Sequence, residues 1–191
     1  MRRVVRGLLI GLWLGVGWMT ATAHGDTKTW AGTVDSDWFN GANWAGGQPG
    51  DGDDVVVDAG ASRALLLTNS TPSLSSFTLT ANTLTFSNWD TSLNATSVAI
   101  NAGAIVTLPA AFAESDMSNR AHFACGDLTL ATNAAVNVAG KGFTGSSGPG
   151  KGANGGGTGG GGGGHAGLGG AGSGAGGAAY GDMAAPLSPG S

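Results

Sequence analysis

Residues 98–108 read VAINAGAIVTL, and residues 128–138, thirty positions later, read LTLATNAAVNV; the two runs align without a gap. In each run apolar residues alternate with small or polar ones, stop at a corner of Ala, Asn or Gly, and alternate again. This pattern is typical of two half-buried strands joined by a tight corner. An earlier run, 77–86, reads FTLTANTLTF and has the same form with one residue fewer between its apolar pairs. Units that repeat in this way are expected to stack as coils, each burying its apolar row against its neighbours.

An antiparallel β-sandwich also has short strands at regular spacing. Two features favour a solenoid. The turns inside each unit lack the Asn-Gly or Asp-Gly pairs that form tight hairpins. The units also repeat by translation, with the same kinds of residue at each corner. We therefore predict an all-β fold in which residues 61–139 form β-solenoid repeats.

The composition excludes several other classes of protein. The chain has 191 residues, of which 38 are Gly and only 10% are charged. Glycine at this density costs too much backbone entropy for a compact helical or α/β domain. A single cysteine, Cys125, excludes a disulfide scaffold. A net charge of −4 excludes a strongly basic nucleic-acid binder, so we expect no nucleic-acid partner.

The first 23 residues have the pattern of a secretory signal. Arg2, Arg3 and Arg6 precede an apolar run over 8–19, which is too short to span a bilayer of about 30 Å. Residues 21–23, Ala-Thr-Ala, then match a small-x-small cleavage site. We predict a signal peptide over 1–23, a mature chain that begins at His24, and no stable membrane span after cleavage.

Residues 24–60 form a Trp-rich segment that we expect to cap the N-terminal end of the repeats. Trp30, Trp38 and Trp44 are spaced by Asp, Asn and Gly turns and followed by an apolar strand near residues 54–58. Three Trp side chains bury a large area, which suits the end of a small core.

The same segment carries a resemblance to a protein family. Its residues follow a W-x-G…W…N-W…P…D-x-V-x-I pattern, which resembles the opening of large secreted bacterial surface proteins with autotransporter-like or other β-solenoid passenger regions. The residues that carry it are Trp30, Gly32, Asp37, Trp38, Asn43, Trp44, Pro49, Asp53 and Val55–Val57. The resemblance implies a right-handed parallel β-helix with this segment at its N-terminal edge.

Residues 140–191 form a glycine-rich region, with 23 Gly among residues 140–181. Such a segment has too few side chains for a conventional core. It is either a flexible linker or an array of extended polyglycine strands paired through backbone groups. Sparse larger residues favour local order within a longer protein: Phe143, His165, Leu168 and Tyr180. In the present chain alone we expect this region to be disordered. The pattern of glycines resembles that of glycine-rich insertions in bacterial β-solenoid surface proteins, and it is also similar to the glycine-rich region of anaplastic-lymphoma-kinase-type receptors. We expect the chain to be a fragment of a larger surface protein.

The densest acidic cluster is Asp51, Asp53 and Asp54, with Asp58 nearby. Carboxylates at a turn are suitable calcium ligands, but the spacing does not match an EF-hand. The cluster therefore has two interpretations, a calcium site or ordinary turn chemistry before a strand.

Glu114, Asp116, Arg120 and His122 form the only mixed acid–base group, in an insertion between two units. One short loop does not establish that such groups converge on a substrate. Residues 145–151 match the first seven positions of a phosphate-binding P-loop, but Gly152 stands where Ser or Thr is required. Cys125 is expected to be a buried small side chain. His165 is a candidate metal ligand, but the tract around it has no further ligands. Asn69 and Asn94 begin N-x-Ser/Thr glycosylation sequons, which arise by chance in a chain rich in Thr and Asn.

We assign no catalytic, cofactor-binding or metal-ligating residue and expect no cofactor. The sequence predicts a secreted, non-enzymatic structural or adhesive protein of the cell surface or extracellular matrix, with surface polysaccharide or other surface proteins as partners. The alternative is the N-terminal part of a secreted carbohydrate-active β-helix enzyme, a polysaccharide lyase or glycoside hydrolase.

Overall fold

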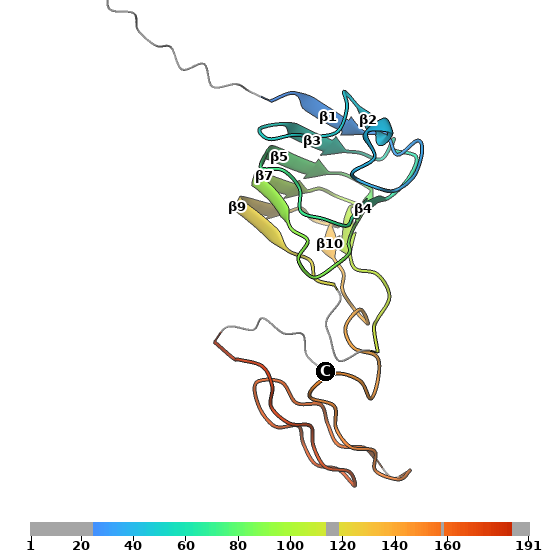
Figure 1. Cartoon of the computed structure of the whole chain (residues 1–191), viewed down its shortest axis with the longest axis vertical. Helices are drawn as coiled ribbons and strands as arrows, with labels where there is room; N and C mark the ends of the chain where they lie inside the picture. The colour runs from blue at the N-terminus through green and yellow to red at the C-terminus, as the bar shows by residue number, and fades with distance from the viewer. Residues whose placement is uncertain (1–24, 114–118, 158, 185–191) are drawn as a thin grey trace, which may run out of the picture.

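A computed structural model describes residues 25–113, 119–157 and 159–184 (Figure 1). The predicted signal segment and two acids of the mixed group, Glu114 and Asp116, lie outside these residues. The all-β prediction is confirmed, since the described residues hold no α-helix and a single short 3-10 helix. The elements are β1 (Thr27–Trp30), η1 (Gly41–Asn43), β2 (Trp44–Ala45), β3 (Asp54–Val57), β4 (Leu65–Leu67), β5 (Leu74–Leu79), β6 (Thr83–Phe86), β7 (Leu93–Ile100), β8 (Ile105–Thr107), β9 (Phe123–Leu130) and β10 (Ala135–Val136).

The strands form two sheets. The first has the order β2-β1-β3-β5-β7-β9 and the second the order β10-β8-β6-β4. From β3 to β10, successive strands alternate between the two sheets, and each pairs in parallel with the strand two places along the chain. Only β1 and β2 pair antiparallel among the described strands. This connectivity differs from that of an antiparallel sandwich.

The lateral pairing follows the alignment of the repeated runs. Val98 pairs with Leu128, and Ile100 pairs with Leu130, on β7 and β9. On the second sheet Val106 pairs with Val136. Because the strands are parallel and in register, residues at equivalent places in each run lie above one another in columns.

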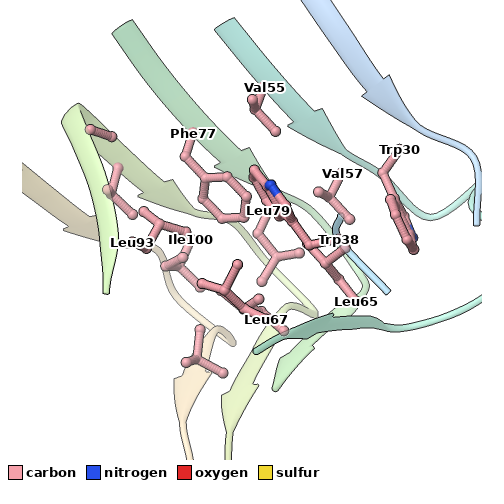
Figure 2. Packing of buried hydrophobic residues seen from close by; sticks show 14 of the residues in the cluster. Trp30, Trp38, Val55, Val57, Leu65, Leu67, Phe77, Leu79, Leu93 and Ile100 are labelled. Carbon is pink, nitrogen blue, oxygen red and sulfur yellow. The ribbon is translucent and has the colours of Figure 1, made fainter. Parts of the chain in front are cut away.

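The core lies between the sheets, where alternate side chains of both point inward (Figure 2). Burial on the strands alternates with period two, so that Thr78 is half-buried while its neighbours Phe77 and Leu79 are fully buried. The fully buried side chains of the two sheets are Trp30, Val55, Val57, Phe77, Leu79, Leu93 and Ile100 on the first and Leu65, Leu67, Leu84, Phe86 and Val106 on the second.

The corners between the sheets explain the small residues of the repeat. Ala81, Gly103 and Asn133 each occupy the corner of one unit, with φ of 48°, 77° and 65°. Glycine and asparagine adopt this left-handed conformation most easily, and a bulky or β-branched residue would be strained there. The corner amide of Asn82 also donates to the carbonyl of Asp58 in the preceding turn, at 3.1 Å.

The last strand of each sheet exposes its apolar row. Leu128 and Leu130 are 50% and 51% exposed, whereas their partners on β7, Val98 and Ile100, are 2% and 0% exposed. On β10 Val136 is 42% exposed. Among the described residues, the core columns therefore end at β9 and β10, whose apolar side chains have a neighbouring strand on one side only.

The glycine-rich region is an array of extended segments joined by backbone hydrogen bonds. The Ala153 N–H donates to Ala175 O, and the Gly162 N–H to Gly170 O, both at 2.8 Å. The segments lie so close that a Cβ added at Gly177 would be 1.7 Å from Gly150 O. Of the larger residues, Leu168 is 81% exposed. The other three form ring contacts: Phe143 with Phe112 at 4.8 Å, and His165 with Tyr180 at 5.2 Å.

Two leucines in one column test the role of the core. Leu79 is fully buried, and Leu130, two strands along the sheet, is half-exposed. Leu79→Ala should lower the free energy of unfolding by about 2–5 kcal/mol, because it leaves a cavity among packed neighbours. Leu130→Ala should cost about 1 kcal/mol or less. Urea unfolding followed by circular dichroism measures both, and equal losses would contradict the column model.

Two glycine-to-alanine substitutions test the packing of the glycine array. Gly177→Ala places a methyl group against backbone and should disrupt the packing of the array. A Cβ at Gly145 would meet nothing within 4 Å, so Gly145→Ala should leave the array intact. Hydrogen exchange should show faster exchange of the amides of 150–177 in the first variant alone. Fast exchange throughout this segment in the unaltered protein would instead indicate a linker.

Candidate functional site

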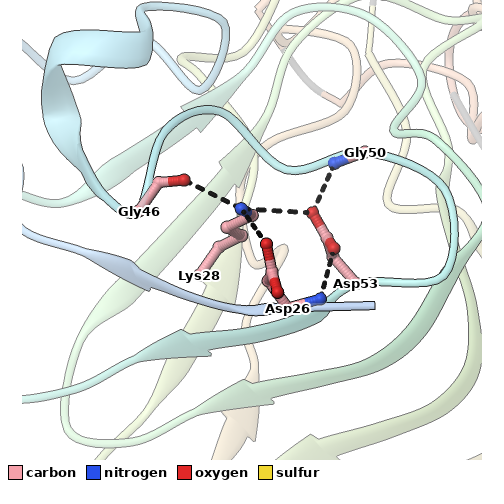
Figure 3. Close-up of polar contacts among 5 residues, drawn as sticks. All are labelled: Asp26, Lys28, Gly46, Gly50 and Asp53. Carbon is pink, nitrogen blue, oxygen red and sulfur yellow. Dashed lines mark hydrogen bonds and ion pairs between the residues drawn. The ribbon is translucent and has the colours of Figure 1, made fainter. Parts of the chain in front are cut away.

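One acid of the cluster singled out in the sequence, Asp53, lies with Asp26 beside a lysine, Lys28, at the N-terminal end of the first sheet (Figure 3). Asp53 is largely buried and accepts hydrogen bonds from the backbone N–H groups of Asp26 and Gly50, both at 2.8 Å. The Lys28 Nζ lies 3.2 Å from Asp26 Oδ2 and 4.0 Å from Asp53 Oδ2, and it donates to Gly46 O at 2.8 Å. The ammonium group stands beside both carboxylates, where a bound cation would otherwise balance their charge.

The other acids of the cluster face different partners. Asp51 accepts from the Ser73 N–H at 2.8 Å, Asp54 from the Ser76 hydroxyl, and Asp58 from the Gly60 N–H at 2.8 Å. Across the described residues, no three His, Cys, Asp or Glu side chains are grouped to hold a metal ion. In the structure these carboxylates accept hydrogen bonds at turns and strand ends.

Lys28 was missed in the sequence analysis, although a signal was present. It is the only Lys or Arg among residues 24–60, and it lies on a strand of alternating Thr residues beside the acidic turn. A lone basic residue within a strongly acidic segment is a candidate for an ion pair.

The three tryptophans pack together over the end of the core. Trp44 makes edge contacts with Trp30 and Trp38, with ring centroids 4.9 and 4.8 Å apart. The indole N–H of Trp30 donates to Arg63 O at 2.9 Å, and that of Trp44 donates to Trp38 O at 2.7 Å. Such edge contacts and hydrogen bonds fix the orientation of large rings as well as burying them.

A buried amide organises the loop that carries Trp38. The side chain of Asn43 is fully buried; its Oδ1 accepts from the Val34 and Asp35 N–H groups, and its Nδ2 donates to Asp35 Oδ1 at 2.6 Å. Asp35 also accepts from the Asn40 amide at 2.8 Å and from the Asp37 N–H at 2.9 Å. These bonds, first of all those from Asn40 and Asn43, hold the pKa of Asp35 below its ordinary value.

The loop also extends the second sheet at its N-terminal edge. The Leu66 N–H donates to Ser36 O at 2.7 Å, and the Trp38 N–H donates to Leu66 O at 3.1 Å. Asp37 thereby forms a parallel bridge with Leu66 on β4. Residues of the W-x-G…N-W pattern are thus brought together as one cap over both sheets, which we call the Trp cap: Trp30, Gly32, Asp37, Trp38, Asn43 and Trp44.

Gly32 has a specific reason to be glycine within this cap. Its φ is 57°, and a Cβ there would lie 2.9 Å from Trp30 Nε1 and 3.0 Å from Arg63 N. A side chain at this position would be strained and would displace the indole from its hydrogen bond to Arg63 O.

Arg120 and His122 are the described members of the mixed acid–base group. Arg120 stacks over the ring of Trp89, with its Cζ 4.6 Å from the ring centroid. The buried Arg120 Nε and His122 Nδ1 have no hydrogen-bond partner. The sequence analysis did not single out Trp89. No local sequence pattern shows that this ring contacts an arginine from a later loop. The arrangement is a cation–π contact between two loops.

The remaining candidates are dispersed. Residues 145–147 and Lys151 line a cavity of about 200 Å³, but no helix follows to direct its N-terminus at a phosphate, because residues 152–157 and 159–184 are not helical. Cys125 is half-buried on β9 and packs against the core. His165 contacts Tyr180, and the Asn94 side-chain amide donates to Thr71 O at 2.7 Å.

No family model, curated protein or solved structure matches this chain. Within the described part of the chain, no helix has the length and apolar character needed to cross a bilayer. The geometry of the Trp cap and of the parallel sheets therefore carries the argument about function.

The Asp35 bonds predict an acid sensitivity of the cap. Because the pKa of Asp35 is lowered on folding, its contribution to stability is fully present above the unfolded-state pKa and is lost as the pH falls through the folded one. Asp35→Asn should lower the melting temperature most near about pH 6, and this difference should shrink below about pH 4. Calorimetry at constant ionic strength measures the pH profile, and a difference that does not change with pH would contradict the assignment.

Proposed function

We propose that the protein is a secreted structural and adhesive component of a cell surface or extracellular matrix, built on a right-handed parallel β-solenoid. In this proposal β3–β4, β5–β6, β7–β8 and β9–β10 are four successive coils. The alternation of strands between two parallel sheets and the in-register columns of apolar residues support it. Stacked coils grow along one axis, so they suit an extended scaffold better than an enclosed reaction site.

The observation that carries the proposal is the Trp cap. It covers the N-terminal edges of both sheets, with β1 paired to β3 and Asp37 bridged to β4. A stack of coils needs a terminal unit of this kind, because its first coil would otherwise expose its core. The capped end and the repeated columns together are the features of a scaffold that begins at the Trp-rich segment.

The outer face of the first sheet supports the adhesive part of the proposal. Most of the side chains that alternate with the core residues on β5, β7 and β9 are small, and many bear hydroxyl groups: Ser76, Thr78, Thr96, Ser97, Ala99, Ala124 and Thr129. Asn94 and the charged Asp127 lie among them. Parallel strands about 4.8 Å apart present these groups as a regular, shallow surface. Such a surface fits an extended polymer, and surface polysaccharide or another surface protein is the proposed partner.

Secretion is proposed from the sequence of residues 1–23. Expressed with this segment in a secreting bacterium, the chain should be recovered outside the cytoplasm with His24 at its N-terminus, as read by mass spectrometry. Ala23→Glu should block cleavage because it removes a small residue from the small-x-small site. Thr22→Ser is the control and should be processed normally. An uncleaved chain in the membrane fraction of the unaltered protein would contradict the proposal.

Adhesion has a separate test, with the mature chain immobilised on beads and insoluble cell-wall polysaccharide as the probe. Thr78→Glu combined with Thr129→Glu should reduce retention at least several-fold, because the pair adds charge to the outer face of the first sheet. Thr85→Glu, on the second sheet, should retain the polysaccharide like the unaltered chain. No retention by the unaltered chain would contradict a polysaccharide partner and leave the secretion result unaffected.

A further inference from the structure

The two ends of the paired sheets differ in a way that points to a partner. At the N-terminal end, the Trp cap covers the core and pairs with both sheets. At the other end, β9 is the last strand of the first sheet and has β7 on one side only within the described structure. Figure 1 shows β9 at this edge, below β7. An eight-residue edge with exposed apolar side chains is a site for pairing with another strand.

The order of inward and outward side chains along β9 is the same in both directions. Phe123, Cys125, Leu128 and Leu130 pair with buried positions on β7 and therefore point inward. Ala124 and Thr129 point outward, and Gly126 and Asp127 at the centre are both exposed, like Thr96 and Ser97 on β7. From either end the strand reads in, out, in, out, out, in, out, in.

This symmetry matters because a two-fold axis pairs a strand with itself in the antiparallel direction. With the axis between Gly126 and Asp127, Phe123 lies opposite Leu130 of a second copy, and Cys125 lies opposite Leu128. Every inward apolar residue then meets an inward apolar residue, and Ala124 meets Thr129 on the outer side. A strand whose pattern were not symmetric would set inward side chains against outward ones.

The charge at the centre of β9 fits the same register. Asp127 is the only charged residue of the strand, and it lies opposite Gly126, which has no side chain. The two Asp127 carboxylates are therefore diagonal to each other on the exposed outer side rather than directly opposed, where solvent and salt weaken their repulsion. We propose that two copies of the chain associate through β9, in antiparallel register about a two-fold axis, so that the first sheet continues across the dimer.

The closed N-terminal end limits the assembly to two copies. A head-to-tail contact would need a long strand edge at that end, but the edge strand there, β2, has only two residues, and the Trp cap covers the core beside it. Among the described strands of the first sheet, β9 alone therefore offers a long edge, and a contact between two copies of the same edge closes after one step. The inference does not depend on secretion or adhesion.

The native cysteine provides a sharp test of the register. Directly opposite residues of an antiparallel pair have Cα atoms about 4.5–5.5 Å apart, within the range for a disulfide. Leu128→Cys should therefore form a disulfide-linked dimer with Cys125 of the second copy under oxidising conditions, seen on a non-reducing gel. Leu130→Cys, opposite Phe123, should form little of this product. Cross-linking in the second variant alone, or in neither, would overturn the register.

Sedimentation equilibrium of the full mature chain tests the association itself. We expect a concentration-dependent dimer, and Leu128→Lys should weaken it by at least tenfold because it places a charge in the apolar contact. Leu168→Lys is the control, since Leu168 is an exposed leucine of the glycine array. Circular dichroism would show that both variants keep their strands. A monomer at all concentrations, or open-ended oligomers larger than a dimer, would overturn the proposal.

Discussion

The structure depends on the contact between apolar side chains of neighbouring parallel strands. Leu79, Ile100 and Leu130 occupy one column, but only the first two are fully buried, because each has a strand on both sides. Each strand covers the apolar side chains of the strand before it, and its own apolar side chains are covered by the strand after it. Burial of each apolar side chain is worth about 1.5–3 kcal/mol, so the ends of the stack are where stability is most easily lost.

The N-terminal end meets this requirement with an irregular loop. Its backbone runs across the ends of both sheets, so its polar groups must be satisfied without a regular ladder. Asn43 serves this purpose, since its side-chain amide bonds three backbone groups of residues 34–37 and its backbone carbonyl accepts from the Ala31 and Gly32 N–H groups. The tryptophans can then cover the core because the loop that carries them is held in place.

The regular part of the fold was predictable from the sequence, since the repeated runs already contain the register. Val98 and Leu128 align in the sequence and pair in the sheet, because translation along the chain becomes translation along the stack. The polar contacts were not predictable in this way. Lys28 contacts Asp53, and Trp89 contacts Arg120, although the partners are 25 and 31 residues apart in the sequence. No repeat or periodic pattern in the sequence relates these positions. The sequence also did not predict that Leu79 is buried and Leu130 half-exposed, because burial depends on whether a strand has a neighbour on both sides and not on the residue type.

The glycine array satisfies the same need for contact by a different physical means. Its segments have almost no side chains to bury, so the backbones approach until their N–H and C=O groups pair, as for Gly169 with Gly177 at 2.8 Å. At Gly161 and Gly164 even a methyl group would collide with the neighbouring backbone. Apolar columns tolerate exchange among side chains of similar size, whereas this packing tolerates only glycine at its closest approaches. Glycine is therefore a packing requirement at these close approaches, whereas at positions such as Gly145 and Gly167 an added Cβ would meet nothing within 4 Å.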